Sequence, residues 1–179
     1  RRALMVASGV KPRHLGIEAE AAYAGRGVSY CAICDGAFFR NKITAVVGGG
    51  NAALQSAIYL SDICEKVYLI HRRTGFRAEQ AVVEKMQSIG NIEQLLNKTV
   101  ADLSGEPTLS TVTLRDTVTG ETSEITVNGL FVSIGQVPEN DVYRDLIKLD
   151  ESGFIVADES CLTSCPGVFA AGDCRTKKI

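Results

Sequence analysis

The chain has 179 residues with 19 basic and 21 acidic side chains, so its charge is nearly balanced. This length allows one full core, or one domain with pieces of another. Without a basic run or stripe, the composition argues against a nucleic-acid or polyanion binder. No apolar run approaches the ~20 residues that a membrane-spanning helix requires, so no membrane segment is expected.

The first half of the chain alternates strand-like apolar runs with glycine turns and helical patterns. The clearest helix follows three glycines, and its Ala53, Ala57 and Leu60 recur at helical spacing. In chain order we predict a strand, a loop, a helical turn, a strand, a helix, a strand and a helix over residues 3–8, 10–27, 31–34, 42–47, 51–63, 66–71 and 78–88.

After Asn91 the pattern changes to short strands separated by turn residues, with a hairpin at Thr119-Gly120. We predict short antiparallel strands over 92–96, 111–116 and 123–127, a buried strand over 129–134, and strand-like segments over 153–156 and 167–173. The order of these elements is that of an α/β, Rossmann-like domain, in which an antiparallel β-meander is inserted into a parallel βαβ sheet.

A glycine-rich turn stands between the predicted strand at 42–47 and the helix after it. Gly48-x-Gly50-x-x-Ala53 fits the dinucleotide-binding fingerprint. Gly48 permits the tight turn, Gly50 lets the backbone approach a pyrophosphate, and Ala53 lets the helix pack close to the strand. The helix N-terminus then presents N–H groups and the positive end of its dipole to the phosphates. A purely structural glycine turn is the alternative.

Three arginines stand where NAD-binding proteins carry a carboxylate for the ribose hydroxyl, roughly 20 residues beyond the glycine turn. Arg72, Arg73 and Arg77 follow the strand at 66–71. Guanidinium groups form bidentate, charge-assisted contacts with phosphate oxygens, so a ribose 2′-phosphate explains their presence. The alternative is a solvated basic loop. Their position relative to Gly48 favours NADP(H) over NAD(H).

The stretch Cys31-Ala32-Ile33-Cys34-Asp35 allows three interpretations. A zinc site needs four ligands, and the one candidate second pair, Cys161 and Cys165, lies far along the chain without a histidine knuckle. A structural disulfide leaves Asp35 unexplained. A redox dithiol uses the small CxxC ring and one activated thiol, with Asp35 as proton donor or acceptor. We favour the redox pair and expect no metal. The long apolar strands do not suit a secreted disulfide scaffold, which favours a cytoplasmic location.

Five stretches of the chain occur together in one order. They are GRGVSYCAICDG at 25–36, GGGNAA at 48–53, HRRTGFR at 71–77, FVSIGQVPEN at 131–140 and GVFAAGDCR at 167–175. Together they resemble the bacterial-type, low-molecular-weight thioredoxin reductases of the flavoprotein disulfide reductase family. The resemblance implies that NADPH reduces FAD, that FAD reduces the CxxC disulfide, and that the resulting dithiol reduces thioredoxin.

The resemblance also implies a role for individual residues. Cys31 and Cys34 would be the redox pair, and Asp35 the acid–base partner. The implied cofactor-binding residues, of which the last two face FAD, are Gly48, Gly49, Gly50, Asn51, Ala53, His71, Arg72, Arg73, Arg77, Ile134, Gly135, Gly172 and Asp173. A homodimer of the full-length protein is implied as well, with thioredoxin as the partner protein.

The family begins with a GxGxxG turn for FAD, and nothing like it precedes Arg1. We therefore expect the end of a first FAD-domain segment at 1–13, the NADPH-binding domain with its CxxC at 14–138, and the start of a second FAD-domain segment at 139–179. Such a chain would bind NADPH and be inactive alone. Two alternatives stay open: a related flavoprotein reductase with another protein-disulfide acceptor, and a stand-alone NADP(H)-binding module.

Overall fold

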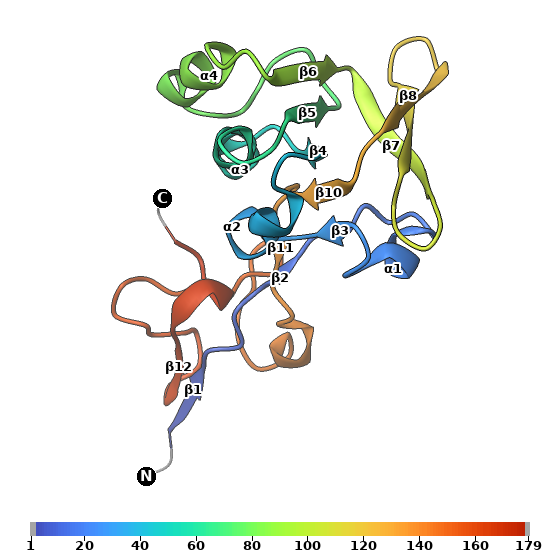
Figure 1. Cartoon of the computed structure of the whole chain (residues 1–179). Helices are drawn as coiled ribbons and strands as arrows, with labels where there is room; N and C mark the ends of the chain where they lie inside the picture. The colour runs from blue at the N-terminus through green and yellow to red at the C-terminus, as the bar shows by residue number, and fades with distance from the viewer. Residues whose placement is uncertain (1–2, 178–179) are drawn as a thin grey trace. The chain divides into compact units, whose positions relative to one another are not determined.

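The computed structural model describes residues 3–177 and divides the chain into two compact units (Figure 1). The smaller unit combines Arg1–Pro12 with Gln136–Ile179, and the larger is Arg13–Gly135. Within residues 3–177, no helix is both long enough and apolar enough to cross a membrane.

The larger unit is built on a parallel sheet with the strand order β3-β10-β4-β5-β6. In chain order these strands are Val28–Ser29 (β3), Ile43–Val47 (β4), Lys66–His71 (β5), Ile92–Leu96 (β6) and Gly129–Val132 (β10). Helices Asn51–Ser61 (α3) and Gln80–Gln87 (α4) make the crossovers between β4, β5 and β6. The strand order therefore reverses at β4, with β5 on one side of it and β10 on the other.

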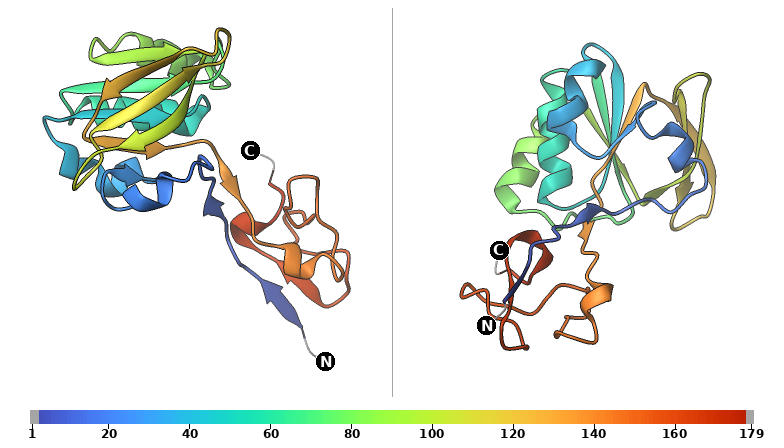
Figure 2. Two further views of the ribbon diagram at one scale, coloured as in Figure 1. Left: turned by 90° about the vertical axis from the view of Figure 1, so that its right-hand side faces the viewer. Right: turned by 90° about the horizontal axis from the view of Figure 1, so that it is seen from below.

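Three layers result, because alternate residues of each strand point to opposite faces of the sheet. In β4, Val46 joins the core under α3 and α4, whereas Ala45 and Val47 join the core on the other face. That second face is covered by an antiparallel sheet of Lys98–Ser104 (β7), Thr111–Asp116 (β8) and Thr122–Thr126 (β9). Figure 2 shows the helices and this meander on opposite sides of the parallel sheet. The predicted βαβ sheet with a meander is confirmed.

The prediction of an antiparallel strand over 92–96 is wrong in its pairing. β6 lies parallel to β5 at the edge of the main sheet, and the first meander strand is β7, which we did not predict. The two strands are separated by Asn97 alone, whose φ of 55° turns the chain sharply. Asparagine tolerates this left-handed conformation better than most residues. The polar content of β7 (KTVADLS) hid it from a search for apolar runs.

Two short elements of this unit matter for the site. Ala32–Asp35 (α2) is a single helical turn, as predicted, and the 3₁₀ helix Gly36–Phe39 (η1) follows it. The predicted loop over 10–27 contains a further helical turn, Glu20–Tyr23 (α1).

The smaller unit holds two pairs of short strands. Leu4–Val6 (β1) lies parallel to Val168–Ala170 (β12), and Lys11–Pro12 (β2) lies antiparallel to Gln136–Val137 (β11). Two 3₁₀ helices, Asp141–Tyr143 (η2) and Gly172–Cys174 (η3), complete it. The expected strand-like segment over 153–156 is absent among the described residues; Ile155 forms only isolated bridges.

The core of the smaller unit gathers around a buried amide. Val6, Ile155 and Cys174 belong to one buried cluster. The Asn140 side chain donates to the carbonyls of Gly153 at 2.9 Å and Cys174 at 2.8 Å. These bonds satisfy a buried polar group and tie the loops of the unit together.

Candidate nucleotide cleft and dithiol site

The turn between β4 and α3 requires glycine at its first position. Gly48 has a φ of 152°, which side chains rarely adopt. A Cβ there would overlap the carbonyl oxygen of Ser133 and lie 2.6 Å from the Cβ of Ala53, which is itself completely buried. Helix and strand therefore approach as closely as the two small residues allow.

Gly50 poses a different question, because the fold itself does not require glycine there. Its φ of −100° is available to any residue, and a Cβ would meet no atom within 4 Å. Gly50 is the N-cap of α3, and no side chain caps this helix end. The fold therefore leaves the backbone open at Gly50, and the N–H groups of a helix N-terminus suit an anion.

A cleft of about 550 Å³ opens at this turn. It lies beyond the carboxyl ends of β4 and β10, where the strand order reverses and ligands of open α/β sheets bind. Its lining residues are Arg13, Leu15, Val47, Gly48, Gly49, Gly50, Asn51, Ala52, Ile70, His71, Arg72, Arg73, Arg77, Lys98, Thr99, Val100, Ser133, Ile134 and Gly135.

The cleft is strongly basic, because five of its lining side chains are arginine or lysine and none is a carboxylate. Among residues 3–177, no carboxylate forms a salt bridge with Arg72, Arg73 or Arg77. Lys98 is paired with Asp116 at 2.8 Å. Hydrogen bonds from Lys98, and then from two backbone N–H groups, lower the pKa of Asp116 to about 2. The unpaired guanidinium groups favour an anionic ligand.

Backbone contacts hold the basic loop against the glycine turn. The N–H of Arg77 donates to the carbonyl of Gly49 at 2.7 Å, and Arg77 forms an isolated parallel bridge with Gly50. The Thr117 hydroxyl lies 3.3 Å from the carbonyl oxygen of Arg72 and 3.2 Å from that of Asn97. The guanidinium groups of the arginines and the backbone of the glycine turn therefore line the same cleft.

His71 packs beneath the turn. The ring is buried, stacks on Phe76 with centroids 5.3 Å apart, and has Nε2 3.0 Å from the carbonyl oxygen of Gly75. Burial lowers the pKa of His71, the neighbouring arginines lower it further, and the bond to Gly75 opposes both. A Cβ at Gly49 would overlap this ring. The ring therefore accounts for Gly49, the middle glycine of the turn.

The Asn51 side chain is engaged within the protein. Its Oδ1 accepts the backbone N–H of Glu79 at 2.8 Å, and its Nδ2 donates to Oε1 of Glu79 at 3.1 Å. Asn51 thus clamps the start of α3 to the start of α4, although it also lines the cleft. Sequence reasoning did not identify Glu79, Arg13 or Lys98 at this site, since no motif marks them.

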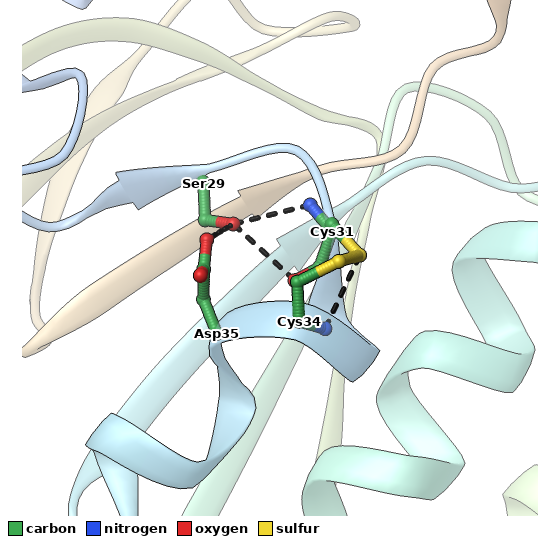
Figure 3. Close-up of a disulfide and its surroundings, with 4 residues drawn as sticks. All are labelled: Ser29, Cys31, Cys34 and Asp35. Atoms are coloured by element: carbon green, nitrogen blue, oxygen red, sulfur yellow. Dashed lines mark hydrogen bonds between the residues drawn. A yellow bond between two sulfur atoms is a disulfide. The ribbon is translucent and has the colours of Figure 1, made fainter.

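The two CxxC cysteines form a disulfide (Figure 3). Cys31 is the N-cap of α2, and its Sγ accepts the backbone N–H of Cys34 at 3.2 Å. Cys34 is exposed and Cys31 is half-buried, so the disulfide is accessible to another molecule. Ile33 between them is 77% exposed. Within residues 3–177, no three metal-ligating side chains gather in a way that could hold an ion.

Asp35 ends α2 and faces back toward β3 (Figure 3). Its Oδ2 accepts a hydrogen bond from Oγ of Ser29 at 2.6 Å. Ser29 was not among the predicted site residues, although a serine two positions before the first cysteine was the available signal. The remaining cysteines are free thiols: Cys64 and Cys174 are buried, and Cys161 and Cys165 are half-buried.

The other predicted site residues fall in two places. Ile134 and Gly135 line the cleft with the glycine turn and the arginines. Ala53 lies below the turn rather than in the cleft lining. Gly172 and Asp173 belong to η3 of the smaller unit, where Asp173 pairs with Lys177.

The family model described as pyridine nucleotide-disulphide oxidoreductase matches residues 2–179. The chain belongs to this family. Among its curated members, the thioredoxin reductase of Mycoplasma genitalium is 47% identical over 179 residues, which cover 99% of this chain and 57% of the relative.

Solved members of the family agree in three dimensions. The crystal structure of Lactococcus lactis thioredoxin reductase matches with a TM-score of 0.91 and 35% identity, over 99% of this chain and 59% of that one. The crystal structure of T. acidophilum thioredoxin reductase matches with a TM-score of 0.89 and 34% identity, over 98% of this chain and 58% of that one. The chain thus spans a little over half the length of the relatives it matches.

Proposed function

We propose that the chain is the nucleotide-binding and dithiol part of an NADPH-dependent thioredoxin-disulfide reductase. Electrons would pass from NADPH to FAD, to the Cys31–Cys34 disulfide and on to thioredoxin. One observation carries the proposal: a basic cleft without carboxylates and an accessible CxxC disulfide occur in the same compact unit. The similarity to proteins named thioredoxin reductase supports it.

NADPH fits the cleft by chemistry and by space. The pyrophosphate would lie against Gly50, where the backbone is open, beside the tight turn that Gly48 makes. The 2′-phosphate would meet Arg72, Arg73 and Arg77, with Ile134 and Gly135 along the cofactor. Because a carboxylate in this position would repel a phosphate, the arginines favour NADPH over NADH.

For FAD we propose the Gly172–Asp173 turn of the smaller unit. Gly172 has a φ of 79°, and a Cβ there would meet no atom within 4 Å, so the backbone is open to a ligand. When bound, FAD supplies the link between two-electron hydride chemistry and reduction of a disulfide one sulfur at a time. In this proposal the FAD-domain segments expected at 1–13 and 139–179 correspond to the smaller unit. The NADPH domain expected at 14–138 corresponds to the larger unit, which begins at Arg13 and ends at Gly135.

The reduced dithiol performs the last transfer. One thiolate of the pair attacks a sulfur of the acceptor disulfide, so that the acceptor S–S bond breaks and a mixed disulfide forms. The acceptor thiolate that leaves takes a proton, which Asp35 can supply. The second thiolate then attacks the mixed disulfide, which restores the Cys31–Cys34 bond and releases the acceptor as a dithiol. Two electrons have moved to the acceptor.

The resemblance to the reductases supports two further parts of the proposal. The full-length protein would act as a homodimer, and it would do so in the cytoplasm, where a thioredoxin is available. Both rest on the relatives named thioredoxin reductase.

The test is NADPH oxidation coupled to thioredoxin by the full-length, FAD-loaded protein, of which this chain would be a part. We expect Cys31→Ser or Cys34→Ser to abolish thioredoxin reduction while NADPH still reduces the flavin. Cys161→Ser is the matched control and should retain turnover. Full turnover by either CxxC variant would contradict the mechanism. Turnover with another protein disulfide but not with thioredoxin would assign the related reductase instead.

A further inference from the structure

Ser29 joins two parts of the dithiol site through one hydroxyl group (Figure 3). Its Oγ accepts the backbone N–H of Cys31 at 3.1 Å and donates to Oδ2 of Asp35 at 2.6 Å. The carbonyl oxygen of Cys31 lies 3.4 Å from the same hydroxyl. A serine hydroxyl has one hydrogen to donate, and the much shorter contact indicates that Asp35 receives it.

The hydroxyl belongs to a strand of the parallel sheet, whereas the carboxylate belongs to the helical turn that carries the disulfide. Ser29 is 7% exposed and lies in β3 opposite the buried Phe131 of β10. Asp35 is the last residue of the four-residue turn that carries the disulfide. Within residues 3–177, Ser29 supplies the one hydrogen bond that the Asp35 carboxylate receives. The parallel sheet therefore determines the direction of the carboxylate.

We propose that Ser29 is a positioning residue of the dithiol site, and that its hydroxyl orients Asp35 and stabilises the ionised carboxylate during thiol–disulfide exchange. The proposal rests on the proposed function, because it gives Asp35 a proton to carry. Ser29 itself touches neither sulfur nor acceptor in this account.

The expected signature is a displaced pH profile. A hydrogen bond donated to a carboxylate favours its charged form. Without the hydroxyl, the charged form of the carboxylate loses this bond, and the part of the profile that depends on Asp35 moves to higher pH. The direction is the same whether Asp35 acts as acid or as base.

The exchange can be measured without a nucleotide or a flavin. The protein is reduced with dithiothreitol, freed of it, and mixed with oxidised glutathione over a series of pH values. Each oxidised glutathione takes two electrons and leaves as two reduced molecules, while the Cys31–Cys34 bond forms. Alkylation and mass spectrometry of the peptide that carries both cysteines exclude signal from the other four. The pH-dependent limb that disappears in Asp35→Asn is the one assigned to Asp35.

We expect Ser29→Ala to move this limb to higher pH, Ser29→Thr to leave it in place, and Ser29→Ala to change nothing further in an Asp35→Asn background. An unmoved limb in Ser29→Ala would overturn the proposal, and so would a profile that Asp35→Asn does not change. Neither result bears on NADPH-driven reduction of the flavin, because the exchange assay contains no nucleotide. Failure of this proposal is therefore distinguishable from failure of the proposed function. If Ser29→Ala does not fold, Ser29→Thr and Ser29→Val, which share a shape, are compared by the same criteria.

Discussion

An alanine at position 50 separates what the glycine turn does for a ligand from what it does for the fold. The backbone of Gly50 is ordinary and its surroundings are empty, so the methyl group fits. Alanine restricts the unfolded chain, which stabilises the protein by about 0.4–1 kcal/mol. It is a poorer N-cap than glycine by a comparable amount, about 0.5–1 kcal/mol. The two effects nearly cancel, and the free energy of unfolding should stay within about 0.5 kcal/mol of the parent.

The same methyl group occupies the space where the backbone would approach the pyrophosphate. We expect Gly50→Ala to weaken NADPH binding by at least about tenfold, which is 1.4 kcal/mol. Gly48→Ala is the matched control. It combines a strained φ, about 1–3 kcal/mol, with overlap against Ser133 and Ala53, about 1–3 kcal/mol, so it should lose roughly 2–6 kcal/mol of stability.

Urea denaturation and calorimetric titration with NADPH measure the two effects on the same samples. Gly50→Ala should unfold like the parent and bind poorly, whereas Gly48→Ala should unfold early. Unchanged NADPH affinity in Gly50→Ala would refute the assignment of the turn to a nucleotide. A loss of stability in Gly50→Ala as large as that of Gly48→Ala would show that the space around Gly50 has been misjudged.

Three further predictions concern the cleft. In calorimetry, Arg72→Ala should weaken NADPH binding roughly 10- to 100-fold by removing a charged hydrogen bond to phosphate, and it should leave NADH binding unchanged. Substitution of the exposed Arg115 by alanine should affect the binding of neither nucleotide. Equal loss for both nucleotides in Arg72→Ala would contradict the 2′-phosphate assignment. Gly49→Ala should displace the His71 ring and lower the urea midpoint, and an unchanged midpoint would show that the ring moves freely. Burial lowers the pKa of His71 below its ordinary 6.5, so the unfolded chain takes up the proton first and stability should fall as the pH drops below about 6.5; His71→Gln should lose this part of the pH dependence, and an identical dependence in the variant would assign it to other groups.

The strands and helices of the main sheet could be predicted because the sequence patterns that indicate them are local. The β-branched apolar run that forms β4 ends at the three glycines before α3. The runs KVYLIH and IEQLL coincide with β5 and β6 residue for residue. Pairing was harder to predict, since it depends on which edge a strand reaches. Asn97 alone redirects the chain from the parallel sheet into the meander, and a single asparagine with positive φ has no periodic signature.

The site divides in the same way. The fingerprint predicts that Gly48 and Ala53 pack closely, and in the structure a Cβ at Gly48 would lie 2.6 Å from the Cβ of Ala53. The cleft also needs Arg13, whose backbone N–H bonds the carbonyl of Gly135 across more than a hundred residues of sequence. Ser29 depends likewise on the packing of α2 against β3. Such residues are recruited by tertiary structure, so a motif search does not find them.

Anaerobic addition of NADPH to the full-length, FAD-loaded protein, followed by rapid alkylation, tests the central claim most directly. Mass spectrometry of the peptide that carries Cys31 and Cys34 reports whether electrons from the nucleotide reach this disulfide. We predict that both cysteines become alkylated with NADPH, that NADH at the same concentration gives far less, and that Gly50→Ala suppresses the NADPH signal. A Cys31–Cys34 disulfide that stays intact while NADPH reduces the flavin would contradict the account.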